Sequence, residues 1–215
     1  MSEIESVVCA IQEGALAVLP TDTVYGLVCT AFERQPAVDL YRLKGRSEIQ
    51  PTAFLASSVD VLLECVPELR GRPEMVARAL LPGPFTLVLP NPARRFGWLS
   101  ESRPGTIGVR VPVLAGPTAE IVARLGAIVA TSANLPGCPD PRRLDEVPAQ
   151  IRAGVAAALD GGELPGTPST VIDLTGPEPV ILRVGAGDPE EALERAAAVH
   201  TQSLPPHDHS LTHEE

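Results

Sequence analysis

Short apolar runs alternate with helical patterns from the first residues of the chain. Between Glu3 and Glu13, apolar residues recur at the three- and four-residue spacing of an amphipathic helix. Gly14 follows, and glycine commonly ends a helix because it adopts the left-handed conformation freely. The apolar run from Leu16 to Leu19 comes next. This segment is therefore predicted to be a helix that leads into a buried strand.

Similar apolar runs recur along the chain. They are short, bounded by Gly or Pro, and rich in Val and Ile, which is typical of interior strands. The predicted strands are Ala53 to Ala56, Phe85 to Leu89, Ile107 to Val111, Ala127 to Ala130, Val155 to Leu159, Thr170 to Leu174 and Val180 to Leu182.

Helical patterns separate many of these strands, and several begin with Pro at a position suited to a first helical turn. The predicted helices are Pro36 to Leu43, Val59 to Cys65, Pro73 to Leu81, Pro117 to Leu125, Pro148 to Ala153 and Pro189 to Val199. This alternation predicts an α/β fold with a mixed, twisted sheet. The sequence contains no internal repeat and no Gly- or Ser-rich linker, so we expect one domain over residues 1–200. Residues 201–215 combine paired Pro with His, Asp and Glu, and are predicted to be a disordered tail.

Charge limits the classes of ligand that the surface can bind. The chain of 215 residues has 17 basic and 27 acidic side chains, a formal charge of -10. This is the wrong sign for a protein that binds nucleic acid over its whole surface. An anionic ligand must therefore be held by a local cluster of basic residues. Lys44 is the only lysine, which invites a specific explanation for it.

The distribution of His and Cys argues against several kinds of catalytic site. The four His lie at or beyond the end of the last predicted helix, so a Ser-His-Asp mechanism and a His-liganded metal are not expected. The four Cys lack C-x-x-C spacing and are expected to be reduced thiols. The acidic start MSEIESVV is unlike a signal peptide, and no apolar run approaches a membrane-spanning length. We expect a soluble, cytoplasmic protein with no membrane contact.

Polar residues gather immediately beside the apolar strands, where α/β folds place their ligand sites. Each segment alone is also compatible with a simple turn, because Ser, Thr, Asn and Asp favour turns for local reasons. The segments are PTDTVYGL (20–27), LKGRSEIQP (43–51), TIGVRVP (106–112), ATSANLPG (130–137), TPSTVIDL (167–174) and LRVG (182–185).

Together these segments supply hydroxyl groups and the basic residues Lys44, Arg46, Arg110 and Arg183. A guanidinium grips a phosphate or carboxylate with two hydrogen bonds, so the set suits a polyanion together with a small zwitterion. The alternative for Arg110, which lies inside an apolar strand, is an ion pair with a core carboxylate. The sequence has no G-x-x-x-x-G-K-[ST] loop and no G-x-G-x-x-G after a strand, so an ATP site would not be one of the common nucleotide folds.

The order of PTDTVYGL, KGR, LPGPFTLVL, TIGVRVP, TSAN, PSTVIDL and LRVG resembles the YrdC family over about residues 4–185. The resemblance implies a single domain whose twisted sheet and helices enclose a large concave cavity. It implies a threonylcarbamoyl-AMP synthase, a nucleotidyltransferase that converts L-threonine, bicarbonate and ATP to threonylcarbamoyl-adenylate and pyrophosphate. This product serves the threonylcarbamoyladenosine modification of tRNA, and a separate transferase complex acts downstream. The chemistry needs no protein nucleophile, since positioning and charge neutralisation can carry it.

The resemblance also implies roles for particular residues. Lys44 and Arg46 would hold the ATP phosphates as the catalytic pair, with Mg²⁺ sharing the charge. The threonine contacts would come from Thr21 or Thr23, Tyr25, Arg110, Ala130 and Ser169. The remaining nucleotide contacts would come from Gln50, Thr106, Ser132, Asn134, Asp140 and Arg183.

Several positions depart from the family pattern and leave alternatives open. Ser47, Gln50, Leu55 and Asp140 replace residues that are common in relatives, so the amino-acid specificity stays open. One alternative is a paralogue that carbamoylates and adenylates another substrate. A second is the carbamoyl-adenylate chemistry of hydrogenase-maturation carbamoyltransferases, against which the length of the chain and the lack of C-x-x-C pairs argue. Others are a nucleotide-binding module without turnover and an RNA-binding module, or weak RNA binding beside the main activity. The overall charge and the 3% of aromatic residues argue against RNA binding as the main role.

Overall fold

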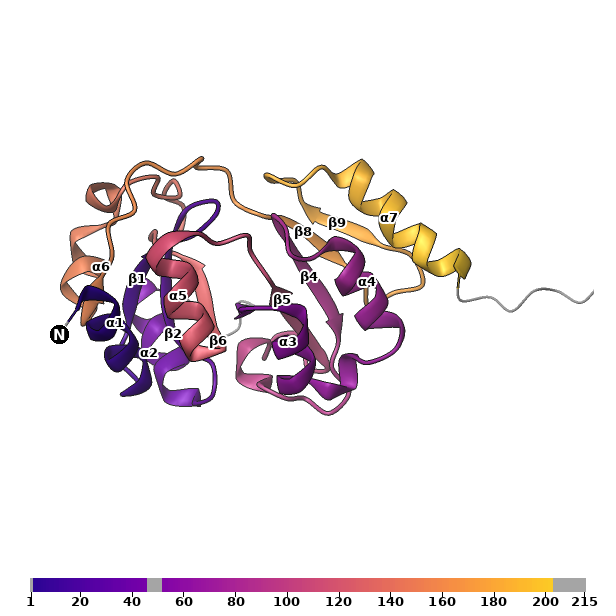
Figure 1. The fold of residues 1–215 in the computed structure, drawn as a ribbon, viewed down its shortest axis with the longest axis horizontal. Helices are drawn as coiled ribbons and strands as arrows, with labels where there is room; N and C mark the ends of the chain where they lie inside the picture. The colour runs from indigo at the N-terminus through magenta and orange to yellow at the C-terminus, as the bar shows by residue number, and fades with distance from the viewer. Residues whose placement is uncertain (1, 46–51, 203–215) are drawn as a thin grey trace, which may run out of the picture.

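The computed structural model describes residues 2–45 and 52–202, which form one large sheet with helices on both faces (Figure 1). The strands are β1 (Ala17–Pro20), β2 (Tyr25–Thr30), β3 (Ala53–Ala56), β4 (Phe85–Pro90), β5 (Thr106–Arg110), β6 (Ala127–Ser132), β7 (Ala157–Ala158), β8 (Thr170–Asp173) and β9 (Val180–Arg183). The helices are α1 (Glu3–Gln12), α2 (Arg34–Lys44), α3 (Val59–Cys65), α4 (Arg72–Leu80), α5 (Gly116–Leu125), α6 (Ala149–Ala153) and α7 (Pro189–Gln202). Short 3₁₀ helices cover Pro67–Leu69, Gly97–Leu99 and Leu144–Glu146.

The predicted fold class is confirmed, and each predicted strand has a counterpart within about two residues at either end. The exception is β2, which was not predicted as a strand because its first residues belong to the polar PTDTVYGL segment. At the C-terminal end, α7 continues to Gln202, two residues beyond the predicted domain boundary at residue 200. The rest of the predicted tail lies outside the described residues.

The sheet has nine strands in the order β7-β1-β2-β6-β3-β5-β4-β8-β9. It is mixed, because β1 with β7, β3 with β5, and β4 with β8 are parallel pairs, while the other neighbours are antiparallel. This order brings β2, β6, β3, β5 and β4 side by side in the centre. The polar segments beside these strands, far apart in the sequence, therefore meet in space.

Side chains alternate between the two faces of the sheet. On one face, Leu27, Phe54 and Leu87 join a large core with residues of α2, α3, α4 and α7. On the other face, Leu19 and Leu55 pack in a smaller core beneath α1 and α5. Figure 1 shows α1 and α5 side by side over one end of the sheet, and α4 and α7 together at the opposite end. Two short helices cannot cover nine strands, so part of the second face carries no helix from the described ranges.

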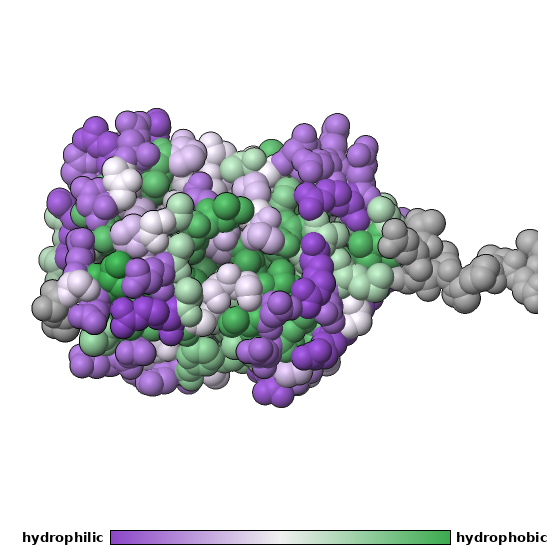
Figure 2. Space-filling model, in the orientation of Figure 1, coloured by the Kyte–Doolittle hydropathy of each residue, from purple (hydrophilic) through white to green (hydrophobic). Residues whose placement is uncertain are grey.

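Polar and apolar residues are unevenly distributed over the surface. Figure 2 shows hydrophilic residues over both ends of the viewed face, with a more apolar band between them. Among residues 2–45 and 52–202, no helix combines the length and the apolar composition needed to cross a bilayer.

The burial of β4 generates a stability prediction. Leu87 is 0% exposed in the large core, whereas Leu182 on the edge strand β9 is 52% exposed. We expect Leu87→Ala to lower the free energy of unfolding by about 2–5 kcal/mol, because it removes buried surface and leaves a cavity. Leu182→Ala makes the same chemical change and should alter it by about 0.5 kcal/mol or less. Urea denaturation of both variants measures this, and equal losses would contradict the assigned burial.

Candidate active site

A cavity of about 400 Å³ opens on the part of the sheet that α1 and α5 leave uncovered. Its volume lies in the range of small-molecule sites, roughly 300–1,000 Å³. Gly26, Ala53, Gly108 and Ala130 line it from four central strands. Ala53 lies opposite Gly108 on one side and Ala130 on the other. Because these side chains are the smallest available, the strands leave space above the sheet instead of filling it.

Most of the residues predicted for the site surround this cavity. Those that line it are Thr21, Thr23, Lys44, Arg110, Ala130, Ser132, Asn134, Asp140, Ser169 and Arg183. Arg46 and Gln50 lie outside the described residues, so their placement stays a prediction.

The turn between β1 and β2 places the two threonines of the PTDT segment. Thr21 Oγ1 donates to the Val24 carbonyl at 2.7 Å and accepts hydrogen bonds from the backbone N–H groups of Thr23 and Val24. The Thr21 hydroxyl therefore mainly holds the turn together. Thr23 Oγ1 instead accepts a hydrogen bond from Arg110 at 2.9 Å. Of the two candidate threonine contacts, Thr23 is therefore the one whose hydroxyl is hydrogen-bonded to Arg110 in the cavity.

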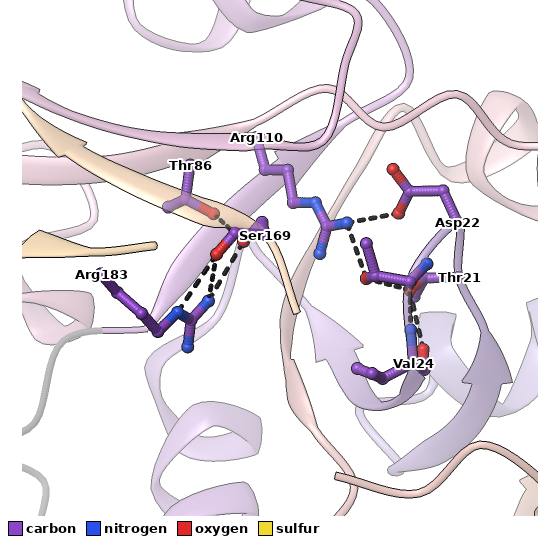
Figure 3. Close-up of polar contacts among 8 residues, drawn as sticks. Thr21, Asp22, Val24, Thr86, Arg110, Ser169 and Arg183 are labelled. Carbon is purple, nitrogen blue, oxygen red and sulfur yellow. Dashed lines mark hydrogen bonds and ion pairs between the residues drawn. The ribbon is translucent and has the colours of Figure 1, made fainter. Parts of the chain in front are cut away.

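Arg110, at the end of β5, is 9% exposed and forms an ion pair with Asp22. Its Nη2 atom donates to both Asp22 and Thr23, while its Nε atom is buried with no partner among the described residues. Figure 3 shows Arg110 between the Thr21–Val24 turn on one side and Ser169 on the other. The alternative considered from the sequence, an ion pair with a carboxylate, is therefore present. It uses only one edge of the guanidinium and leaves other donors for a ligand.

Burial acts on both members of this ion pair. It raises the pKa of the Asp22 carboxyl, while the neighbouring Arg110 guanidinium lowers it in part. Burial also lowers the pKa of Arg110, Asp22 opposes that shift, and the charge of Arg183 adds to it. Arginine stays protonated at any ordinary pH, so the site keeps a fixed positive charge that one carboxylate only partly balances.

Lys44 lies in the last turn of α2 and is only 5% exposed. Its ammonium donates to the Ser132 carbonyl, to Ser132 Oγ at 3.2 Å and to Asn134 Oδ1 at 2.7 Å. Three acceptors can take the three hydrogens of an ammonium group. A phosphate that binds Lys44 would therefore replace at least one of these oxygens. Lys44 thus connects α2 to the TSAN segment at the end of β6.

Ser169, Thr86 and Arg183 form a second polar group on the wall (Figure 3). Thr86 Oγ1 and Ser169 Oγ are 2.8 Å apart. Arg183 donates from Nε and Nη2 to the Ser169 carbonyl, at 3.1 and 2.8 Å. Although Arg183 is exposed at the mouth of the cavity, partial burial lowers the pKa of its guanidinium, and Asp140 opposes this shift.

Two predicted site residues do not line the cavity. Tyr25 is 0% exposed, and its single hydroxyl hydrogen lies within reach of two acceptors, Asp160 Oδ1 at 2.9 Å and the Gly162 carbonyl at 2.8 Å, while the hydroxyl oxygen accepts from the Gly161 backbone N–H. Tyr25 points away because it alternates with Gly26, which faces the cavity. Thr106 bonds the Arg103 carbonyl at 2.9 Å and lies within 3.2 Å of the Ser100 hydroxyl. These hydroxyls stabilise loops around the site, so the expected ligand contacts are not supported by this geometry.

The position of Leu55 is likewise not at the cavity. Leu55 is buried in the small core beneath α1 and α5, and Ala53, two residues earlier on β3, faces the cavity instead. Asp140 does line the cavity. Of these two departures from the family pattern, only Asp140 is placed to influence a ligand.

Asp22 and Thr86 were missed by the sequence analysis. Asp22 lies within PTDT, and its pairing with Arg110, 88 positions away, depends on how distant strands align, for which the sequence carries no signal. Thr86 is the hydroxyl residue in the strand sequence FTLVL, where its neighbours Phe85 and Leu87 face the core. The signal for Thr86 was a hydroxyl residue within an otherwise apolar strand, at a position facing away from the core.

The arrangement suits binding and charge neutralisation more than nucleophilic chemistry. Lys44, Arg110 and Arg183 contribute positive charge, and hydroxyls of Ser and Thr surround them. Within the described ranges, no group of three His, Cys, Asp or Glu is placed to hold a metal ion. Such a cavity can hold an anionic ligand together with an amino acid and align them.

Known proteins are similar to this chain over most of its length. The threonylcarbamoyl-AMP synthase of Pyrococcus abyssi is 36% identical over 193 residues, which cover 86% of this chain and 54% of that protein. The chain thus spans about half the length of the Pyrococcus relative. The human threonylcarbamoyl-AMP synthase is 32% identical over 216 residues, which cover 95% of this chain and 74% of the human protein.

Solved structures share the fold. Pyrococcus abyssi Sua5 in complex with L-threonine matches with a TM-score of 0.79 and 34% identity, over 89% of this chain and 56% of that one. Escherichia coli YciO matches with a TM-score of 0.76 and 25% identity, over 88% and 92% of the two chains. The sequence model of the Sua5/YciO/YrdC family, described as "Telomere recombination", matches residues 9–185. This chain therefore belongs to the Sua5/YciO/YrdC family.

Proposed function

We propose that this protein is a threonylcarbamoyl-AMP synthase, which makes threonylcarbamoyl-adenylate and pyrophosphate from L-threonine, bicarbonate and ATP. The relatives above bear this name, and one neighbouring structure holds L-threonine. The observation that carries the proposal is the buried guanidinium of Arg110, which keeps an unpartnered Nε in the described structure beside a cavity rich in hydroxyls. A buried donor without a partner is costly, and a carboxylate ligand would satisfy it.

The amino acid would bind at the Arg110 end of the cavity. Arg110 would receive the substrate carboxylate, because a guanidinium matches a carboxylate with two hydrogen bonds. Thr23 and Ser169 would lie on either side of it, and Ala130 would supply the flat floor. Thr21 would act through the turn that it holds, and Tyr25 through the loop that its hydroxyl bonds.

The nucleotide would bind toward the other side of the cavity. Lys44 would meet the phosphates after exchanging one of its protein oxygens, with Ser132 and Asn134 beside it. Asp140 and Arg183 would meet the nucleotide at the mouth. Arg46 and Gln50 are proposed as phosphate and ribose contacts on the strength of the family resemblance alone, and Thr106 would act indirectly through its loop.

The reaction would proceed by alignment of the reactants. The threonine nitrogen forms a bond to the carbon of bicarbonate, water leaves, and the ammonium proton passes to solvent. One oxygen of the resulting carbamate then attacks the α-phosphorus, and pyrophosphate departs with its bonding electron pair. Lys44 and the guanidinium groups would stabilise the charge that develops, which is the largest single contribution in many enzymes. Mg²⁺ would arrive on the ATP phosphates and share their charge, since a metal-binding cluster is not found among the described residues.

The product would pass to a tRNA-threonylcarbamoyl transferase complex for modification of tRNA in the cytoplasm. The chain's own contact with RNA would be weak, because the formal charge of -10 repels a polyanion away from the cavity. The chain would act on small molecules, with tRNA as the substrate of its partner.

Pyrophosphate release from the purified protein tests the proposed function. We expect release that requires ATP, Mg²⁺, bicarbonate and L-threonine together, and that falls when any of them is omitted. L-serine in place of L-threonine tests the specificity. Binding of ATP without release under every combination would refute the synthase and favour a binding module.

The lysine provides a test of the phosphate site. We expect Lys44→Met to lower the rate of pyrophosphate release by about 100-fold or more, as removal of one preorganised donor to a transition state does. Methionine keeps the apolar stem, so the packing of α2 is preserved. Circular dichroism and thermal denaturation serve as the control for folding. A folded variant with full activity would exclude Lys44 from the mechanism.

Arg110 provides a test of the amino-acid site. Arg110→Lys keeps a positive charge near Asp22 but removes the second nitrogen that a carboxylate needs. We expect the KM for L-threonine to rise by roughly 10- to 100-fold, the loss of one charge-assisted hydrogen bond, with little change in the KM for ATP. The matched control is Arg124→Lys on the exposed face of α5. Equal changes in both KM values would contradict the assignment.

The floor of the cavity provides a third test. A Cβ atom at Gly108 would meet Thr52 O at 3.8 Å and Ala53 Cα at 4.0 Å, which are ordinary contacts. Gly108→Val should therefore fold, and valine favours a strand. Its methyl groups would fill the cavity, so we expect substrate binding to fall by about tenfold or more while thermal stability is kept, since overpacking a site costs 1–3 kcal/mol. Gly108→Ala should lie between the wild type and Gly108→Val in calorimetric titrations with ATP.

A further inference from the structure

We propose that Thr86 and Ser169, together with Nη1 of Arg183, form a subsite for a small carbonate-type oxyanion beside the amino-acid carboxylate that Arg110 would receive. In the reaction it would hold bicarbonate and then the carboxylate end of the carbamate. This rests on the proposed function, which names bicarbonate as a substrate but does not assign it a place. Neither Thr86 nor a bicarbonate contact belongs to the roles assigned above.

The three residues come from neighbouring strands at one end of the sheet. Thr86 lies on β4, Ser169 immediately precedes β8, and Arg183 ends β9. Thr86 pairs with Val171 in the parallel ladder, and Val171 in turn lies opposite Arg183. Directly opposed residues place their side chains on the same face of a sheet. Thr86, Val171 and Arg183 therefore share the cavity face.

A register shift between β8 and β9 makes this possible. Ile172 pairs with Ile181, whereas Val171 pairs with Arg183, so Leu182 is the extra residue of a β-bulge. In regular pairing, Arg183 would share a face with Ile181, which packs against the large core. The bulge turns Arg183 from the core face to the cavity face, and β-bulges commonly re-aim a side chain in this way.

The two hydroxyls leave one hydrogen for a ligand. Each hydroxyl has a single hydrogen to donate. One is used in the 2.8 Å bond between Thr86 Oγ1 and Ser169 Oγ. Ser169 Oγ also lies 3.2 Å from Arg183 Nη2, which can only donate. If Ser169 donates to Thr86, the hydroxyl hydrogen of Thr86 has no acceptor within the described part of the chain. If Thr86 donates to Ser169, the hydroxyl hydrogen of Ser169 is the one without an acceptor there. A hydroxyl hydrogen is thus left over on the cavity wall.

The guanidinium groups leave further donors around the same space. Arg183 uses Nε and Nη2 on Ser169, and its Nη1 has no partner among the residues that the structure describes. Arg110 borders the same space, and its buried Nε, which has no partner in the described ranges, is the donor proposed for the amino-acid carboxylate. In Figure 3, Ser169 lies between the two guanidinium groups. These groups can donate hydrogen bonds but cannot accept them, so the space between them selects against an ammonium group and favours an anion.

Charge supports the same conclusion. The nearby Arg183 disfavours the protonated form of Arg110, so the two cations repel one another without an anion between them. The carboxylates that face them are Asp22 behind Arg110 and Asp140 near Arg183. An anion that binds between the guanidinium groups would relieve the repulsion. Threonylcarbamate carries two carboxylates on one small molecule, which matches two cations in one cavity.

An isosteric change tests the subsite. Thr86→Val replaces the hydroxyl with a methyl group of similar size. We expect the KM for bicarbonate to rise by about tenfold, the loss of one hydrogen bond to an anion, while the KM values for L-threonine and ATP stay within about twofold. Thr86→Ser keeps the hydroxyl and should retain the wild-type KM for bicarbonate. Thr118→Val, a buried Thr→Val change on α5, is the matched control.

Other outcomes overturn the proposal. An increase in the KM for ATP instead of bicarbonate would mean that the cluster binds a nucleotide phosphate. Unchanged KM values in Thr86→Val would mean that the hydroxyl pair is only structural. Thermal denaturation of each variant shows whether a loss reflects unfolding, and Thr86→Ser then decides whether the hydroxyl itself matters.

A measurement without turnover separates this proposal from the proposed function. The ¹³C resonance of labelled bicarbonate is recorded with each protein in the absence of ATP and L-threonine. We expect the wild type, Thr86→Ser and Thr118→Val to broaden the line, and Thr86→Val to broaden it much less. Equal broadening by all four proteins, or none by any, overturns the subsite. Absence of pyrophosphate release from the wild type, by contrast, would refute the synthase while this binding test still stands.

Discussion

The buried ion pair between Arg110 and Asp22 holds the functional face of this molecule together. A guanidinium at the end of a central strand would be expensive to bury alone, and Asp22 offsets part of that cost from the turn between β1 and β2. The pair joins strands that are not neighbours in the sheet, since β2 and β5 are separated by β6 and β3. Because Asp22 uses one edge of the guanidinium, Arg110 is oriented before any ligand arrives. Such preorganisation reduces the ordering that binding would otherwise require.

The cavity follows from an imbalance between helices and strands. The large core occupies one face of the sheet, and α1 with α5 covers only part of the other. Over the remaining area, Gly and Ala side chains leave space above the sheet, and polar side chains from the strand ends surround that space. The acidic composition and the basic cavity are compatible because two of the cavity's cations, Lys44 and Arg110, are buried beside the ligand space instead of spread over the surface. The net charge of -10 disfavours long-range attraction of RNA, while the cations of the cavity can still bind a small anion at short range.

Sequence reasoning was most successful where local chemistry decides the structure. The apolar runs of β3, β4 and β8 and the Pro-started helices were identified nearly to their ends, because periodicity and turn residues act within a few positions. β2 was missed, since its strand begins inside a polar segment whose hydroxyls suggested a loop. Lys44 and Arg110 were found from their unusual residue types. The direction of Tyr25, the partner of Arg110 and the hydroxyl pair at Ser169 depend on register between distant strands, which one sequence does not contain.

The β-bulge at Leu182 determines which face of the sheet Arg183 occupies. Without the bulge, Arg183 would lie on the same face as Ile181, which packs against the large core, so one extra residue decides which face the guanidinium takes. A chain that paired β8 and β9 regularly would turn Arg183 toward the core side and away from the cavity. The edge strand of the sheet therefore contributes to binding through one extra residue in its backbone, since that residue decides whether Arg183 reaches the cavity.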